Sequence, residues 1–124
     1  MVLILSLFIN FFSYNNESIQ HIIDALQIKN SEEIIKFFDK NGEIDINNNI
    51  IEGNKYNLIK TLDNFYFNND IKGFKEIHKG NSENNLTYIL GEYVSNSDIY
   101  KVLVLIQNQD DIQKIIKIKI DIEK

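Results

Sequence analysis

The strongest pattern along the chain is a series of apolar and alternating segments between residues 86 and 123. Residues 99–106 are apolar at nearly every position, which is typical of a strand buried on both faces. The segment after it alternates isoleucine with charged residues, so one face should lie in a core and the other in water. With residues 86–94 these segments predict an antiparallel three-stranded meander with tight turns. The alternating isoleucines are Ile116, Ile118, Ile120 and Ile122.

The upstream half predicts three helices by its 3.6-residue apolar period. The first repeats apolar residues over 19–26, and Asn30 can end it. Ser31 can cap the second, which has Glu32 and Glu33 in its first turn and should stop at Asn41-Gly42. Asn54 can cap the third helix. Its inward positions are Leu58, Ile59, Leu62 and Phe65.

The remaining segments predict strands. Residues 43–46 and 50–52 form a short pair, and residues 71–80 form a weaker strand before the meander. The sequence therefore predicts one α+β domain over residues 17–124. In it, three N-terminal helices pack on one face of a curved, cone-like antiparallel sheet of four long strands plus a short strand pair.

The first twelve residues are apolar and too few to span a bilayer. Followed by a polar stretch at 13–16, they resemble the hydrophobic region of a secretory signal. No Lys or Arg precedes them and no Ala-x-Ala site follows, so a strand or helix docked on the domain is the alternative. We expect residues 1–16 to direct export, which leaves no stable membrane span after their removal.

Composition removes several classes of function. The net charge is -5 and the lysines are scattered, whereas a nucleic-acid binder needs a basic face for phosphates. The chain has no cysteine, which excludes disulfides, thiol catalysis and cysteine-ligated zinc. We expect no nucleic-acid partner, no metal and no cofactor.

Several short motifs follow one another in a characteristic order. They are Phe38-Asp39, His78-x-Gly80, Tyr88-x-x-Gly91 followed by Val94, Tyr100-Lys101-Val102, and Ile120-x-Ile122-Glu123. With the order of helices and strands, they resemble the nuclear-transport-factor-2-like superfamily, also called SnoaL-like or cystatin-like. Within it, residues 17–123 are similar to a family of short, mostly exported bacterial proteins known only as a domain of unknown function. The resemblance implies a fold and a bacterial periplasmic or cell-envelope location, and almost no chemistry.

Two ionisable residues are candidates for a ligand pocket or for catalysis. Isomerases of the superfamily place a general-base Asp just after the helix that Asp39 is expected to close, although Asp39 beside Asn41-Gly42 also suits a turn. Such isomerases add an oxyanion donor, typically a Tyr of the first helix, and residues 19–28 contain none. His78 should share a strand face with Glu76 and could relay protons, but a lone strand histidine is more often structural.

Glu92 and three tyrosines complete the pocket candidates. Glu92 lies in an otherwise apolar strand, so an inward orientation would mark a site, whereas the convex side is favoured. Tyr88, Tyr93 and Tyr100 could line a pocket with apolar rings and polar hydroxyls, or could simply be good strand residues.

One apolar strand also points to an interface. On residues 99–106, Ile99, Leu103 and Leu105 should face away from the helices, where nothing in the chain is predicted to cover them. Superfamily members often dimerise through this convex face, so we expect a homodimer or a docked protein partner there.

Two functional hypotheses remain. The first is a non-enzymatic exported module that binds a small apolar ligand or a protein partner. The second is an isomerase or hydrolase of a small organic substrate that uses Asp39 with His78 or a Tyr. The absent catalytic set favours the first.

Overall fold

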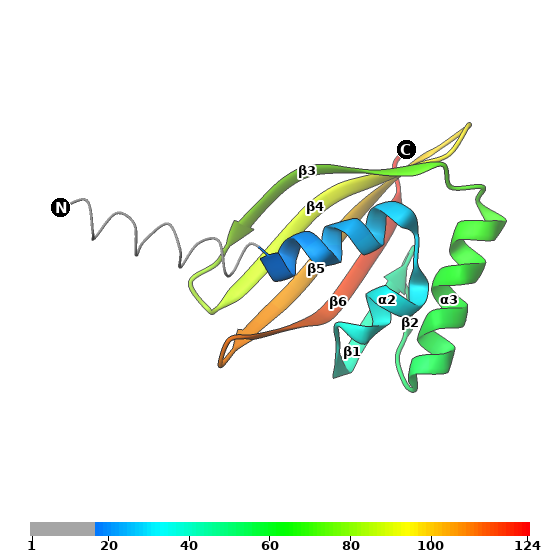
Figure 1. The fold of residues 1–124 in the computed structure, drawn as a ribbon. Helices are drawn as coiled ribbons and strands as arrows, with labels where there is room; N and C mark the ends of the chain where they lie inside the picture. The colour runs from blue at the N-terminus through cyan, green and yellow to red at the C-terminus, as the bar shows by residue number, and fades with distance from the viewer. Residues whose placement is uncertain (1–16) are drawn as a thin grey trace.

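The helices and strands follow one another in the order that the sequence predicts, and together form an α+β fold (Figure 1). The computed structural model describes residues 17–124, so the expected signal segment at 1–16 lies outside the described residues. The first helix covers residues 17–28, α2 covers Ser31–Lys36 and α3 covers Lys55–Asn68. The strands are β1 (Phe38–Ile46), β2 (Asn49–Ile51), β3 (Gly73–Asn81), β4 (Leu86–Val94), β5 (Ile99–Gln109) and β6 (Ile112–Ile122).

Asparagine side chains start two of these helices. The Asn54 side chain accepts a hydrogen bond from the Asn57 N–H at 2.9 Å and so caps α3, as expected. Asn30 caps α2 in the same way, through the Glu33 N–H at 3.1 Å. The expectation that Ser31 is this cap is therefore wrong by one residue.

The six strands form one curved sheet in the order β2-β1-β6-β5-β4-β3. The predicted meander is confirmed, because β3, β4, β5 and β6 pair antiparallel with their neighbours in sequence. The short pair of β1 and β2 is antiparallel as predicted, and it joins the four long strands through a parallel pairing of β1 with β6, which the sequence did not predict. A parallel pair needs a long connection, and here the helix α3 and several strands separate the two partners in sequence.

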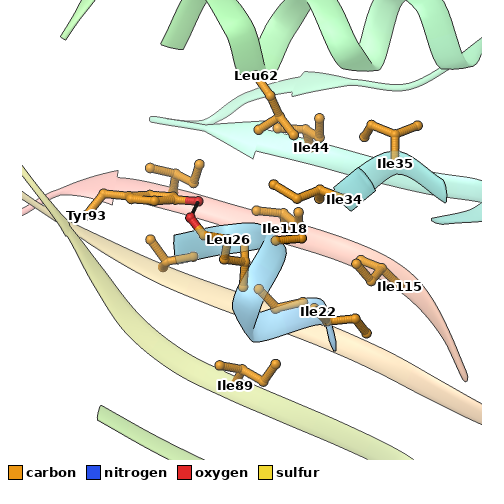
Figure 2. Close-up of a cluster of buried hydrophobic side chains, with 14 of the residues drawn as sticks. Ile22, Leu26, Ile34, Ile35, Ile44, Leu62, Ile89, Tyr93, Ile115 and Ile118 are labelled. Carbon is orange, nitrogen blue, oxygen red and sulfur yellow. Dashed lines mark hydrogen bonds between the residues drawn. The ribbon is translucent and has the colours of Figure 1, made fainter. Parts of the chain in front are cut away.

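The hydrophobic core lies between the helices and one face of the sheet, called here the helix-covered face. In Figure 2, Ile22 and Leu26 of the first helix point at Ile89 and Tyr93 of β4 and at Ile118 of β6. These five side chains are at most 1% exposed. Aliphatic side chains from the helices therefore occupy the space above the strands, as expected of a close-packed protein interior.

The second helix is shorter than its apolar pattern predicts. It ends at Lys36, and Phe38 and Asp39 begin β1 instead of closing the helix. The Asn41-Gly42 pair, expected as a helix stop, lies inside β1 where the pairing with β6 shifts register. A Cβ on Gly42 would lie 2.7 Å from the Phe38 ring, so glycine permits this close approach.

Two β-bulges change which side chains face the core. A bulge between Glu76 and His78 places His78 opposite Leu90, on the other face from Glu76, so the predicted shared face is wrong. A second irregularity in β6 makes Ile115, and not Ile116, the buried partner of Ile106. Ile118 and Ile120 remain buried as expected.

Candidate functional site

The convex face of the sheet, opposite the helices, carries a small block of apolar side chains. Strand register places Leu90 beside Leu103 and Tyr88 beside Leu105 on adjacent strands β4 and β5. Because the alternate residues of both strands are buried under the helices, these four project outward. Leu90 is 39% exposed and the other three are half-buried. We call these four residues the apolar block.

Val94 and Ile99 extend the apolar surface along the same two strands. They pair with each other at one end of the β4–β5 ladder, and Ile99 is 40% exposed. Of the three interface candidates from the sequence, Leu103 and Leu105 therefore lie in the apolar block, and Ile99 lies further along the same face.

Charged residues border this face on the β6 and β1 side. Lys117 contacts Glu43 at 3.4 Å, and Lys119 contacts Asp45 at 3.5 Å and Asp121 at 3.4 Å. Burial lowers the pKa of Lys119, but the charges of Asp121 and Asp45 more than offset this and raise it overall. These pairs border the apolar block with charge, as a polar rim surrounds the centre of a protein interface.

Asp45 is the most enclosed acid of this border, at 5% exposure. Its Oδ2 faces Lys119, whereas its Oδ1 is buried and has no hydrogen-bond partner among residues 17–124. Since burying a carboxylate is costly unless an opposite charge lies close to it, the contact with Lys119 offsets the cost of enclosing Asp45.

The pocket candidates from the sequence lie in separate parts of the sheet. His78 and Tyr88 meet on the convex face, where His78 Nε2 lies 3.1 Å from the Tyr88 hydroxyl. Glu92 is on the same face, opposite Lys101 on β5. Tyr100 lies on the helix-covered face and donates to Asn69 Oδ1 at 3.0 Å. Asp39 makes a local bond, its Oδ2 accepting from the Asn41 N–H at 3.1 Å.

Asp39 and His78 do not come together. Asp39 is on β1 and His78 is on β3, with β6, β5 and β4 between them in the sheet. Four strand spacings correspond to roughly 19 Å, far beyond the reach of a shared hydrogen bond. The two residues therefore cannot exchange a proton directly.

A phenol pair on the helix-covered face was not predicted. The Tyr93 hydroxyl donates to the Leu26 carbonyl at 3.0 Å and lies 2.6 Å from the Tyr66 hydroxyl (Figure 2 shows Tyr93 and Leu26). Burial raises the pKa of Tyr93 well above its ordinary value, and it raises the pKa of Tyr66 as well. Both phenols therefore stay neutral hydrogen-bonding groups inside the core.

A row of amides and a hydroxyl crosses four strands at the hairpin end of the sheet. Thr87 donates to Asn81 at 2.7 Å, Asn108 donates to Thr87 at 3.0 Å, and Gln113 donates to Asn108 at 3.0 Å. Among residues 17–124, the Gln113 Oε1 atom is buried without a partner. The row ties the two hairpins together through neutral hydrogen bonds.

Neither a metal-binding cluster nor a membrane-spanning helix occurs in the part of the chain that the structure describes. Residues 17–124 hold no group of three His, Asp or Glu side chains placed to bind a metal ion. No helix in that range is long and apolar enough to cross a membrane.

Solved structures with the same fold include relatives of unknown function. A protein from Bacteroides uniformis superposes with a TM-score of 0.74 at 20% identity and covers 85% of this chain and 96% of its own. An NTF-2 like protein of unknown function from Burkholderia xenovorans superposes with a TM-score of 0.66 at 14% identity. The match covers 90% of this chain and 84% of the other. A protein of unknown function with a cystatin-like fold from Nostoc punctiforme superposes with a TM-score of 0.65 at 12% identity. The match covers 86% of each chain.

These likenesses show the fold, which is nuclear-transport-factor-2-like as the sequence motifs indicated. The Bacteroides protein is described as a DUF4783 family protein. No functionally curated protein matches the sequence. The pattern of the domain of unknown function DUF4783 matches residues 19–121, which is most of the chain, and the chain belongs to this family.

Proposed function

We propose that this protein is a non-catalytic binding module whose convex sheet face binds another protein chain. The observation that carries this proposal is the apolar block. Its four side chains are contiguous, partly exposed and bordered by charged residues; they belong to Tyr88, Leu90, Leu103 and Leu105. A dry apolar centre with a charged rim is the usual anatomy of a protein–protein interface.

The opposite face offers less to a small apolar ligand. Between the helices and the strands, the described side chains pack against one another, and Ile22, Ile34, Ile89 and Ile118 are at most 1% exposed. The hydroxyls of Tyr66 and Tyr93 already bond to each other, and Tyr93 also donates to the Leu26 carbonyl, so neither is left to bind a ligand. We therefore favour a protein partner over a small apolar ligand.

The isomerase or hydrolase alternative lacks a working acid–base pair. Asp39 and His78 are separated by three strands, and His78 faces the convex side with Tyr88. General acid–base catalysis requires both groups within hydrogen-bond reach of one substrate. This separation supports a binding role.

Site-specific photo-crosslinking tests the binding role. A benzophenone amino acid replaces Leu90 at the apolar block, in the cells that naturally make the protein. The matched control carries the same group at Tyr56 of α3, which is 71% exposed and belongs to a helix, not to the convex face of the sheet. Crosslinked chains are then identified by mass spectrometry.

Crosslinks from position 90 to one defined protein chain, absent at position 56, are the expected result. The bound chain can be a second copy or a different protein, and either supports the proposal. Equal capture at both positions, or none at position 90, would contradict a binding role for this face.

We also propose that the protein is exported. The support is the apolar segment of residues 1–12 followed by the polar residues 13–16. N-terminal sequencing of the protein from a bacterial host should find a mature chain that starts near residue 17 in the periplasmic or envelope fraction. Intact chain that begins at Met1 in the cytoplasm would overturn this expectation.

A further inference from the structure

We propose that the outer edge of β3 binds an extended, acidic segment of another protein, which adds to the six-stranded sheet as a further strand. This surface is the backbone edge of the sheet, and it is distinct from the apolar block on the convex face. The proposal follows from the position of β3, the exposure of its residues and the order of its charges.

β3 is the one long strand of the described sheet that has a neighbour on one side only. It ends the strand order β2-β1-β6-β5-β4-β3, and among residues 17–124 it pairs with β4 alone. The strand at the opposite end, β2, has 3 residues, whereas β3 has 9. No helix of residues 17–124 covers the outer side of β3 in Figure 1. Its outward N–H and C=O groups can therefore pair with an incoming strand.

The side chains along this edge are open to solvent. Residues 75–79 are all exposed, and Ile77 is 56% exposed although it is apolar. A strand that pairs with β3 covers these side chains, because neighbouring strands lie only about 4.8 Å apart. In such a complex the main-chain hydrogen bonds supply the affinity, and the side chains beside them set the specificity.

The charges of β3 favour an acidic partner. The strand carries two lysines, Lys75 and Lys79, and one acid, Glu76, so it is basic in a chain whose net charge is -5. Neither lysine forms an ion pair with another residue of the range 17–124. A second copy of β3 brings the same lysines, and like charges opposed across two strands destabilise the pairing. Carboxylates at the matching positions stabilise it, so the edge favours an acidic segment over a copy of itself.

The β-bulge in β3 sets the spacing of these carboxylates. In a regular strand Lys75 and Lys79 would share a face, because side chains alternate and an even number of positions separates the two. The register instead places Lys75 opposite Glu92, on the convex face. It places Lys79 opposite Ile89, on the helix-covered face. A regular incoming strand therefore reaches both lysines from positions that are an odd number apart, and the spacing from Glu92 to Ile89 indicates three.

Binding of synthetic peptides to the full chain tests this proposal. The probe is the fluorescent peptide Thr-Val-Glu-Val-Thr-Asp-Val-Thr, whose acids are three positions apart among residues that favour strands. One control has glutamine in place of both acids. The other, Thr-Val-Glu-Val-Asp-Thr-Val-Thr, changes only the spacing. By fluorescence anisotropy, the probe should bind about tenfold more tightly than the glutamine peptide and at least about twofold more tightly than the respaced peptide.

Methylation of backbone nitrogens shows whether the probe binds as a strand. The N–H groups of alternate residues point to opposite sides of a strand, so only one alternate set can pair with β3. Methylating that set should abolish binding, whereas methylating the other set should preserve it. Hydrogen exchange gives a second measurement, since the bound probe should slow exchange of the amides of Gly73–Asn81 and leave those of α3 unchanged.

Charge reversal on the protein supplies a matched pair of variants. Lys75→Glu/Lys79→Glu should weaken binding of the probe by at least about tenfold, and it should bind a peptide with lysine in place of both acids. Lys55→Glu/Lys60→Glu makes the same change at exposed positions of α3 and should leave binding unchanged. If circular dichroism shows that the first variant is unfolded, Lys75→Gln/Lys79→Gln replaces it and should weaken binding less.

Three results would overturn the proposal. They are the absence of probe binding at millimolar concentration, equal binding of the probe and the glutamine peptide, and binding that survives methylation of either alternate set. None of them bears on the convex face, which crosslinking from position 90 tests separately.

Discussion

Tyr93 is a large side chain that the structure encloses completely, although it carries a polar group at its tip. The ring packs edge-on against Phe74 at 5.1 Å and against Tyr66 at 5.2 Å between centroids. Its hydroxyl donates to Leu26 at 3.0 Å, so the Tyr66 hydroxyl is free to donate its own proton to the Tyr93 oxygen. One residue of β4 thereby holds both the first helix and α3 on the sheet.

Removing that hydroxyl should destabilise the protein. Tyr93→Phe keeps the ring but removes the donor to Leu26 and the acceptor for Tyr66, at a cost of about 1–3 kcal/mol in the free energy of unfolding. Urea denaturation followed by circular dichroism measures this change. Tyr56→Phe, at a 71% exposed site, should change the stability by less than about 0.5 kcal/mol. Equal effects of the two substitutions would contradict the role assigned to Tyr93.

The same two phenols predict an alkaline loss of stability. Burial raises the pKa of Tyr93 and Tyr66 above the ordinary value of 10.0, so in the folded protein both keep their protons when phenols of the unfolded chain ionise. The stability they contribute is complete below pH 10 and is lost as the pH rises above it, by up to about 1.4 kcal/mol per pH unit for each phenol.

Urea titrations at a series of pH values on both sides of 10 measure that slope. The double variant Tyr66→Phe/Tyr93→Phe lacks both phenols and should show a shallower decline. An identical slope in wild type and variant would mean that these two groups ionise in the folded protein as readily as in the unfolded chain.

The sequence predicted the strands in which Tyr93 and Tyr100 lie, but it did not predict which residues the tyrosine side chains contact. Period-2 alternation identifies which residues of a strand share a side, and it correctly placed Ile99, Leu103 and Leu105 on the face of β5 away from the helices. The bond from Tyr93 to Leu26 joins residues 67 positions apart, which no local pattern encodes. For the same reason, no local pattern shows that Asp39 and His78 lie apart, because the strand order decides their separation.

At the scale of elements, glycine and bulges decide how the strands fit. Gly91 of β4 lies under the Phe74 ring, where a Cβ would be 2.4 Å from Cζ of Phe74 and 2.7 Å from the Lys75 carbonyl oxygen. The close approach of β3 therefore requires a residue without a side chain at this position. A Cβ on Gly73, at the start of β3, would instead meet no atom within 4 Å.

These two glycines make a matched pair of substitutions. Gly91→Ala should cost about 1–3 kcal/mol, because the ring can rotate away but the backbone carbonyl cannot move without distorting the β3–β4 ladder. Gly73→Ala should be neutral or stabilise by about 0.4–1 kcal/mol, through the lower entropy of the unfolded chain. Thermal or urea unfolding compares them. A Gly91→Ala protein as stable as the wild type would contradict the close contact.

The long strands were predictable because their patterns are local. The early end of the second helix was not predictable, because Phe37 and Phe38 continue its helical apolar period. In the structure Phe38 is instead a buried residue of the strand β1. The parallel pairing of β1 with β6 depends on residues more than 70 positions apart, and only the folded sheet reveals it. Pattern and propensity therefore predicted the elements, while the sheet order required the structure.

At the scale of the whole molecule, the two faces of the sheet differ in what covers them. The helix-covered face is filled by the chain itself, whereas the convex face leaves the apolar block partly exposed. Exposed apolar surface on a small protein favours association, because burying it removes water from apolar area. The difference between the two faces thus leads to a prediction about assembly.

Leu103→Asp should convert a self-associating protein to a monomer. Leu103 lies beside Leu90 within the apolar block, and burying a leucine contributes up to about 1.5–3 kcal/mol. An aspartate there also places an uncompensated charge inside the apolar block of each chain. The dissociation constant should therefore rise by roughly a hundredfold or more.

Sedimentation of the wild type and the variant at micromolar concentration measures this change. Tyr56→Asp serves as the control, because it adds the same charge at the exposed first turn of α3, where an acid is favourable to the helix dipole. The control should associate as the wild type does. A wild type that stays monomeric and soluble at these concentrations would contradict self-association through the convex face.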